Sequence, residues 1–321
     1  MTALRRAVTI PVLVAIEVLV LGSAPLLVAL AVVVGAYARS SRPLRSVLLV
    51  ITYFALELRT LARIRRGPDD WDVLVRDTLS TAYRALRTIL DVPLVLTDDS
   101  TAPGANPVVV LARHCGPGDS LFIAWLLAVR FRMRPHIVLK SLLRVEPVID
   151  LAGDHLPLCF VGFRHRTRNR IADLAAGMSA GDALLLFPEG RNFSRQRWLR
   201  TWTDLVARGA RRAARRMRRH THTLPPHHGG AYAALSAAPH ADVLLLAHGG
   251  FTEDGRDRPW WRLPVHRPFV VRTTLVPAAS VPRTEEALGR WLDGAWADVD
   301  RWVEYTVDDV TQVKFGANGN F

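Results

Sequence analysis

Apolar residues fill the first part of the chain almost without interruption. Residues 7–38 read AVTIPVLVAIEVLVLGSAPLLVALAVVVGAYA with Glu17 as the one charged side chain, and this run is longer than the ~20 residues that a membrane-spanning helix needs. Gly22, Ser23 and Pro25 interrupt the run, and arginines flank both of its ends. Because positive charge marks the cytoplasmic side of a membrane, the pattern predicts a helical hairpin that enters and returns, with one tilted span as the alternative.

A third apolar stretch lies between this run and a change in composition. Residues 47–61 are mostly apolar but include Glu57 and Arg59, which is typical of an interfacial helix rather than of a span. Gly67 and Pro68 then end the region, as glycine and proline commonly do between elements. We predict three parts: N-terminal hydrophobic membrane-anchoring helices at 1–66, a folded domain at 67–312 and a polar tail at 313–321.

Short apolar runs alternate with helical patterns through the second part. Asp69 and Asp70 can cap a helix whose apolar positions recur at helical spacing over 75–90, and the same spacing returns over 288–302. Strand-like runs lie at 94–96, 108–112, 137–139, 158–161, 183–187, 243–247 and 269–275. This alternation predicts an α/β fold with a largely parallel sheet covered by helices.

Composition and charge narrow the class of protein. Half of the 321 residues are apolar, which excludes a disordered tail protein, and two cysteines are too few for a disulfide scaffold, so we interpret Cys115 and Cys159 as thiols. The net charge of +13 favours an anionic partner, either nucleic acid or a membrane surface. Only Lys140 and Lys314 among the 42 basic residues are lysines. Part of the arginine excess therefore reflects a coding bias that favours arginine over lysine throughout the chain.

A histidine and an aspartate follow one of the strand-like runs. Residues 108–112 lead into Arg-His-Cys-Gly-Pro-Gly-Asp-Ser, where His114 and Asp119 bracket a turn, and an apolar helix is expected at 121–129. Ligands of open α/β sheets bind outside the carboxyl ends of strands, and a carboxylate on one imidazole nitrogen leaves the other nitrogen free as a base. The alternative is that Asp119 caps the helix and that His114 is an ordinary strand-end residue.

A second strand-to-helix turn carries another motif. The run at 183–187 continues into Phe-Pro-Glu-Gly, whose last two residues are Glu189 and Gly190. Together with His114-x4-Asp119, this block resembles the signatures of the glycerolipid acyltransferase family, which includes the lysophosphatidic acid acyltransferases.

Two further blocks of the family have looser counterparts in the same order. The family block that ends in arginine is similar to residues 158–164, and its proline-containing block is similar to residues 224–230. The resemblance covers residues 90–280, so the domain at 67–312 is expected to be an acyltransferase domain.

The resemblance implies acyl transfer and a role for each residue. His114 would take the proton from the free hydroxyl of a lysophospholipid acceptor, 1-acyl-glycerol-3-phosphate above all, as that hydroxyl attacks an acyl thioester, and Asp119 would orient the imidazole. Glu189 and Gly190 would help to seat the acceptor, while Arg164 would pair with its phosphate, because a guanidinium can bind phosphate in a bidentate way. The alternative is that Arg164 belongs, with Arg166, Arg168 and Arg170, to a solvated face. No cofactor is implied, and acyl-CoA or acyl carrier protein would be the donor co-substrate.

The chain departs from the family pattern at two places. Many members continue Phe-Pro-Glu-Gly with Thr-Arg-Ser, whereas here the arginine follows at once as Arg191, so Arg191 is a substrate-binding candidate and the acceptor can differ. His227 and His228 stand where relatives often have arginine, which would make an anion contact pH-dependent. We do not expect them to bind a metal, because no HExxH pattern or carboxylate at ligand spacing accompanies them.

The remaining alternatives concern the arginines and the reaction. Residues 205–219 are expected to form one helix with an apolar stripe and many arginines, which suits anionic lipid headgroups or a solvated surface equally well. A nucleic-acid-binding protein would explain the charge but neither the hydrophobic N-terminus nor the motifs, and the nucleophile-elbow pattern of serine hydrolases is absent from the sequence. We therefore expect a membrane enzyme at the cytoplasmic face of the cell membrane, with membrane lipids and not nucleic acid as its partners.

Overall fold

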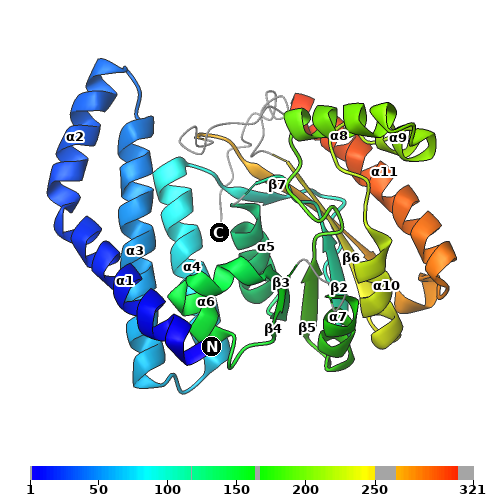
Figure 1. The fold of residues 1–321 in the computed structure, drawn as a ribbon, viewed down its shortest axis with the longest axis horizontal. Helices are drawn as coiled ribbons and strands as arrows, with labels where there is room; N and C mark the ends of the chain where they lie inside the picture. Colours follow the sequence, from blue (N-terminus) through cyan, green and yellow to red (C-terminus); the bar gives the residue numbers. More distant parts are fainter. Residues whose placement is uncertain (1, 117, 163–166, 250–264, 310–321) are drawn as a thin grey trace.

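One sheet of seven strands lies at the centre of the protein (Figure 1). The computed structural model describes residues 2–116, 118–162, 167–249 and 265–309. The strands are β1 (Leu94–Leu96), β2 (Val108–Ala112), β3 (Arg134–Lys140), β4 (Leu158–Val161), β5 (Asp182–Leu186), β6 (Asp242–Gly249) and β7 (Phe269–Val276). Each of the seven runs predicted from the sequence coincides with one of them, and the expected α/β class is confirmed.

The order of the strands places β2 in the middle of the sheet. The order is β1-β7-β6-β2-β5-β3-β4, and every neighbouring pair is parallel except β6 and β7. Leu111 of β2 pairs with Leu245 of β6 on one side and Leu186 of β5 on the other. The carboxyl ends of these three strands therefore lie side by side in the central part of the sheet edge, which is where open sheets bind ligands.

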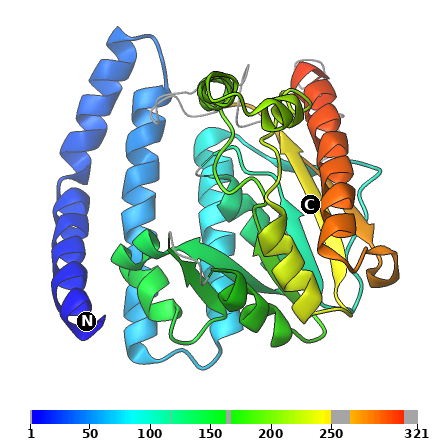
Figure 2. The ribbon, with the colours of Figure 1, turned by 45° about the vertical axis from the view of Figure 1, so that its right-hand side comes forward.

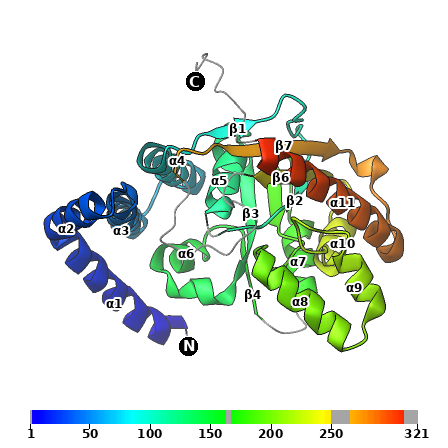
Figure 3. The same ribbon diagram turned by 90° about the horizontal axis from the view of Figure 1, so that it is seen from above.

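Helices cover both faces of the sheet (Figure 3). The helices are α1 (Thr2–Gly22), α2 (Ala24–Tyr37), α3 (Arg42–Arg66), α4 (Trp71–Leu90), α5 (Asp119–Trp125), α6 (Pro147–Ala152), α7 (Thr167–Ala176), α8 (Arg195–Ala207), α9 (Arg211–Met217), α10 (His228–Ala237) and α11 (Glu285–Asp309). Val109 and Leu111 of β2 lie in the core beneath α7, α10 and α11, whereas Val110 and Ala112 lie in the core beneath α4 and α5. Successive residues thus face opposite layers, and all five residues of β2 are buried because a two-sided sheet buries both faces.

Two of the expected helices differ in the structure. The helix expected at 121–129 begins at Asp119 and continues after Trp125 as a π-helical turn, Leu126–Arg130. The single helix expected at 205–219 is wrong, because α8 ends at Ala207 and α9 starts at Arg211. Gly209 lies between them with φ of 68°, a left-handed conformation that a helix cannot continue through and that glycine adopts without strain.

The apolar N-terminal run forms α1 and α2. Within the described residues no single helix is both long and apolar enough to cross a membrane, but Leu4–Gly22 and Ala24–Tyr37 meet these criteria together and are bent by 59° where they join. The expected hairpin is not confirmed: the Ser23 N–H still donates to the Leu19 carbonyl, so the break bends the chain without reversing it. The chain reverses instead between α2 and α3, which lie side by side (Figures 1 and 2).

Ion pairs fasten α1 to α6. The buried Asp150 of α6 accepts hydrogen bonds from Arg5 at 2.6 Å and from Arg6 at 2.9 Å, and Arg144 lies 3.5 Å away. Nearby, Glu57 of α3 accepts the backbone N–H at position 148 at 3.1 Å. The N-terminal helices therefore contact α6 through buried polar groups as well as through apolar packing. The expected tail at 313–321 lies outside the described residues.

Candidate active site

His114 and Asp119 meet at the turn between β2 and α5. The strand ends at Ala112 and the helix begins at Asp119, so the chain folds back and places His114 Nδ1 3.1 Å from both carboxylate oxygens of Asp119. The His114 side chain is 16% exposed and Asp119 is fully buried. The two residues that the sequence predicts as a catalytic pair are thus in hydrogen-bond contact.

Backbone donors hold the Asp119 carboxylate in its ionised form. It accepts N–H groups from Cys115 at 2.7 Å, Gly116 at 2.9 Å and Ser120 at 2.7 Å. Burial alone would raise the pKa of Asp119, but the hydrogen bond with His114 and these donors hold the pKa below its usual range. An ionised Asp119 accepts the Nδ1 proton, so His114 Nε2 is the unprotonated nitrogen of the neutral ring and can act as a base.

Glu189 lies beneath the same turn. One carboxylate oxygen accepts the His114 backbone N–H at 3.1 Å and the other accepts the Leu224 N–H at 2.8 Å, and the residue is 1% exposed. Burial raises its pKa to about 8, although the neighbouring Arg113 and the two N–H donors act in the opposite direction. In this structure Glu189 joins the turn after β2 to the segment before α10, and the acceptor contact implied by the family resemblance stays a prediction.

The other substrate-binding candidates lie around this turn. Gly190 has φ of 68°, and a Cβ atom there would come within 3.1 Å of the His227 ring, so both backbone angle and space favour glycine. Arg191 is exposed and is close enough to His227 to contribute to lowering its pKa, after burial and Arg216. Arg164 lies outside the described residues, so its phosphate contact stays a prediction.

Arg113 and His248 form a reciprocal buried pair that was not predicted from the sequence. The Arg113 guanidinium donates to the His248 carbonyl oxygen at 2.8 Å, and His248 Nε2 lies 2.8 Å from the Arg113 carbonyl oxygen. Burial lowers the pKa of His248 to about 4, so the ring is neutral and its Nε2–H donates to that carbonyl. The same nitrogen lies 3.6 Å from Asp119 Oδ2. The pair joins the ends of β2 and β6 next to the turn that carries His114 and Asp119.

The sequence gives only a weak indication of the contact between Arg113 and His248. His248 directly follows the strand-like run at 243–247, which places it at the same sheet edge as His114. The 135 residues that separate it from Arg113 conceal the contact until the strand order is known.

Cys115 lies beside the buried Arg113–His248 pair. Its sulfur lies 3.7 Å from His248 Nδ1, and burial raises the pKa of the thiol to about 12, so the group is protonated at neutral pH and is no nucleophile. Both cysteines are free thiols, as expected. Cys115, Asp119 and His248 also bring potential metal ligands within 4.8 Å of one another, but Nε2 of His248 and the Asp119 oxygens already hold internal hydrogen-bond partners.

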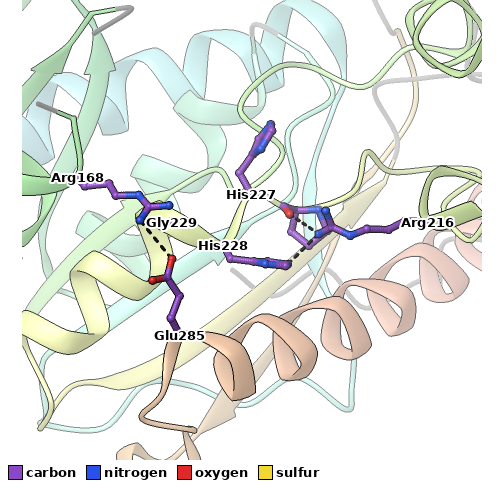
Figure 4. Close-up of a pocket in the computed structure, with 8 residues that line it drawn as sticks. Arg168, Arg216, His227, His228, Gly229 and Glu285 are labelled. Carbon is purple, nitrogen blue, oxygen red and sulfur yellow. Dashed lines mark hydrogen bonds and ion pairs between the residues drawn. The ribbon is translucent and has the colours of Figure 1, made fainter. Parts of the chain in front are cut away.

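An open pocket of about 440 Å³ adjoins the Phe-Pro-Glu-Gly turn (Figure 4). Arg168, Arg216, His227 and His228 line it, together with the first turn of α10. His228 Nε2 lies 2.9 Å from Asp293, a carboxylate that the local spacing did not reveal, and the Arg216 guanidinium lies within 2.8 Å of the same nitrogen. Arg216 also forms an ion pair with Asp293 at 2.5 Å, and Arg168 pairs at 3.2 Å with Glu285, which lines the pocket too, so carboxylates balance the two guanidinium groups.

Comparisons with known proteins agree with this geometry. A family model described as Acyltransferase matches residues 94–246. The crystal structure of the 1-acyl-sn-glycerophosphate acyltransferase PlsC from Thermotoga maritima superposes with a TM-score of 0.53 at 16% identity, covering 86% of this chain and 98% of that one. No curated protein sequence matches this chain.

The family match identifies residues 94–246 as an acyltransferase domain. Residues 94–246 include both motif blocks, β2 and three of the helices packed on it, α5, α7 and α10. This match agrees with the resemblance of the chain's motifs to the glycerolipid acyltransferase family.

Proposed function

We propose that this enzyme transfers a fatty acyl group from an acyl thioester to the free hydroxyl of a lysophospholipid, with 1-acyl-glycerol-3-phosphate as the favoured acceptor and phosphatidic acid as the product. The observation that carries the proposal is the His114–Asp119 contact, which leaves an unprotonated imidazole nitrogen at the carboxyl edge of the sheet. The motif order and the likeness to PlsC support the choice of acceptor.

The geometry supports a direct transfer with one base. His114 Nε2 takes the hydroxyl proton while the acceptor oxygen attacks the thioester carbonyl carbon, and Asp119 stabilises the resulting imidazolium. The tetrahedral intermediate collapses with cleavage of the carbon–sulfur bond, and the imidazolium returns its proton to the leaving thiolate. The hydroxyl of the substrate is the nucleophile, which agrees with the protonated state of the neighbouring Cys115 thiol.

A donor and acceptor panel tests this function. The purified enzyme is assayed with acyl-CoA or acyl carrier protein as donor and with lysophosphatidic acid, other lysophospholipids and uncharged monoacylglycerol as acceptors, measuring both thiol release and lipid product. Equal amounts of released thiol and phosphatidic acid are expected. Thiol release without a lipid product would indicate a thioester hydrolase instead.

A larger anionic acceptor is the second candidate. The pocket beside Gly190 contains the guanidinium groups of Arg168 and Arg216, which pair with Glu285 and Asp293 in the structure, and an additional anionic headgroup on a lysophospholipid could contact these guanidinium groups in competition with the carboxylates. Faster turnover of such a lysophospholipid than of lysophosphatidic acid in the same panel would favour this reading.

The proposed location is the cytoplasmic face of the membrane. Large apolar side chains of α1 and α2 are exposed, among them Leu19 at 73%, Leu26 at 76% and Val33 at 65%, and such a continuous apolar surface is unfavourable in water. Insertion of these helices would hold the active site next to its lipid acceptor.

A further inference from the structure

The highest density of positive charge in the sequence falls on α8 and α9. Residues 195–219 contain ten arginines against one acidic residue, Asp204, and so carry a net charge of +9 out of the chain's +13. Two in five residues of this segment are arginine, against about one in ten elsewhere in the chain. A general bias toward arginine therefore does not account for the concentration.

Most of these arginines lie on the exposed sides of α8 and α9, which we together call the α8–α9 basic face. Its exposed arginines are Arg195, Arg200, Arg208, Arg211, Arg212, Arg215, Arg218 and Arg219. Two apolar side chains are exposed among them, Leu199 at 44% and Val206 at 51%. The opposite side of the two helices is buried, since Trp198 and Met217 pack into a cluster with Cys115.

The basic face lies next to the active site and at a defined end of the molecule. Phe193, two residues before α8, donates its N–H to the His114 carbonyl oxygen at 2.7 Å. Figures 1 and 2 show α8 and α9 at the same end as the connection between α2 and α3. That connection carries Arg39 and the exposed apolar residues of α2 lead to it. One flat surface laid against this end would therefore meet the connection between α2 and α3 as well as α8 and α9.

We propose that the α8–α9 basic face binds the anionic headgroups of a phospholipid bilayer and turns the active site toward it. Each cation near an anionic leaflet contributes to binding, and exposed apolar side chains among cations are typical of helices at a membrane interface. Leu199 and Val206 would have no role against nucleic acid, and a small acidic carrier protein would not also engage α2 at the far side of this end. The binding does not depend on the proposed acyl transfer, so the two fail separately.

The test compares two variants of the full chain with the same change in charge. The first replaces Arg211, Arg212, Arg215 and Arg218 of the basic face with glutamine. The control replaces Arg65, Arg66, Arg283 and Arg290, which are also exposed, at the end of α3 and the start of α11, away from the α8–α9 end (Figures 1 and 2). Thermal unfolding verifies that both variants are folded.

Binding is measured by co-sedimentation with vesicles of pure phosphatidylcholine or with added phosphatidylglycerol, at low and high salt. An arginine near an anionic leaflet contributes about fivefold to binding, so the first variant should lose at least about tenfold in affinity for the anionic vesicles at low salt. The loss should vanish at high salt and on neutral vesicles, and turnover of detergent-dispersed substrate should be unchanged in both variants.

Three outcomes would overturn the proposal. The first is equal binding of both variants to anionic vesicles, and the second is a loss of affinity by the basic-face variant that is as large on neutral vesicles as on anionic ones. The third is a basic-face variant that still binds vesicles but no longer binds acyl carrier protein or duplex DNA. The last result would assign the basic face to that partner.

Discussion

Replacing Asp119 with asparagine tests the proposed catalytic role of the His114–Asp119 contact with almost no change in side-chain volume. Both carboxylate oxygens act as acceptors in the structure: Oδ2 accepts from Cys115 and Gly116, Oδ1 accepts from Ser120, and both lie 3.1 Å from His114 Nδ1. An amide has only one oxygen. Whichever way it turns, its NH2 group faces at least one backbone donor.

The magnitude follows from these contacts. An NH2 group directed at His114 Nδ1 forces that nitrogen to accept, so the proton moves to Nε2 and the base is blocked. Loss of general-base assistance lowers kcat by roughly 100-fold to 10,000-fold, equivalent to roughly 3 to 5 kcal/mol of activation free energy. One buried N–H left without an acceptor also lowers the free energy of unfolding by about 1 to 3 kcal/mol.

The assay separates these two effects. His114→Ala should lose a similar factor in kcat, but it should be less destabilising because the imidazole is partly exposed while Asp119 is buried. The double variant should be no slower than His114→Ala alone, since both residues act in one proton transfer. Wild-type turnover of folded Asp119→Asn, or multiplicative losses in the double variant, would refute the assignment.

Three further predictions follow from other sites. Burial lowers the pKa of His248 to about 4, whereas an unfolded histidine has a pKa of about 6.5, so the free energy of unfolding should fall by up to about 3 kcal/mol as the pH drops from 6.5 toward 4. Urea unfolding at pH 7 and pH 5 should show a larger pH-dependent loss of stability in the wild type than in His248→Gln. An equal loss in both proteins would contradict this prediction. Arg164→Ala should raise the KM of a phosphorylated acceptor far more than that of the donor, with partial recovery in Arg164→Lys, and an equal loss toward uncharged acceptors would reject the phosphate contact. Carbonate extraction should leave the full chain in the membrane fraction, and release by carbonate would contradict a membrane anchor. Reporters fused to the two termini should both lie on the cytoplasmic side, whereas reporters on opposite sides would favour a single span.

Much of the sheet could be predicted because its strands are buried on both faces. Runs such as Val108–Ala112 are apolar throughout and end at turn residues, so the sequence marks them clearly. The predictions fail where a single residue changes the direction of the backbone. Gly209 adopts φ of 68° and divides the helix expected at 205–219, and Pro25 follows a 59° bend where a hairpin was expected. Neither angle is set by hydrophobic spacing.

In the candidate site, the contact between residues close in sequence could be predicted, whereas the contacts between distant residues could not. His114 and Asp119 are five residues apart, so a local turn could bring them together and the sequence showed the pair. The contacts of His248 with Arg113 and of Glu189 with the His114 backbone depend on β6, β2 and β5 being neighbours. Strand order is set by packing of the whole domain, which a single sequence does not display.

The ion pairs between α1 and α6 have a consequence for protein engineering. A shortened chain that omits α1 and α2 is an obvious route to a more soluble enzyme, but it would remove Arg5 and Arg6 from the buried Asp150 and leave Arg144 at 3.5 Å as its remaining described arginine partner. Breaking a buried ion pair from one side costs about 3 to 5 kcal/mol, a large share of the stability of an ordinary domain. Shortened versions of this enzyme should therefore carry Asp150→Asn or a hydrophobic replacement from the outset.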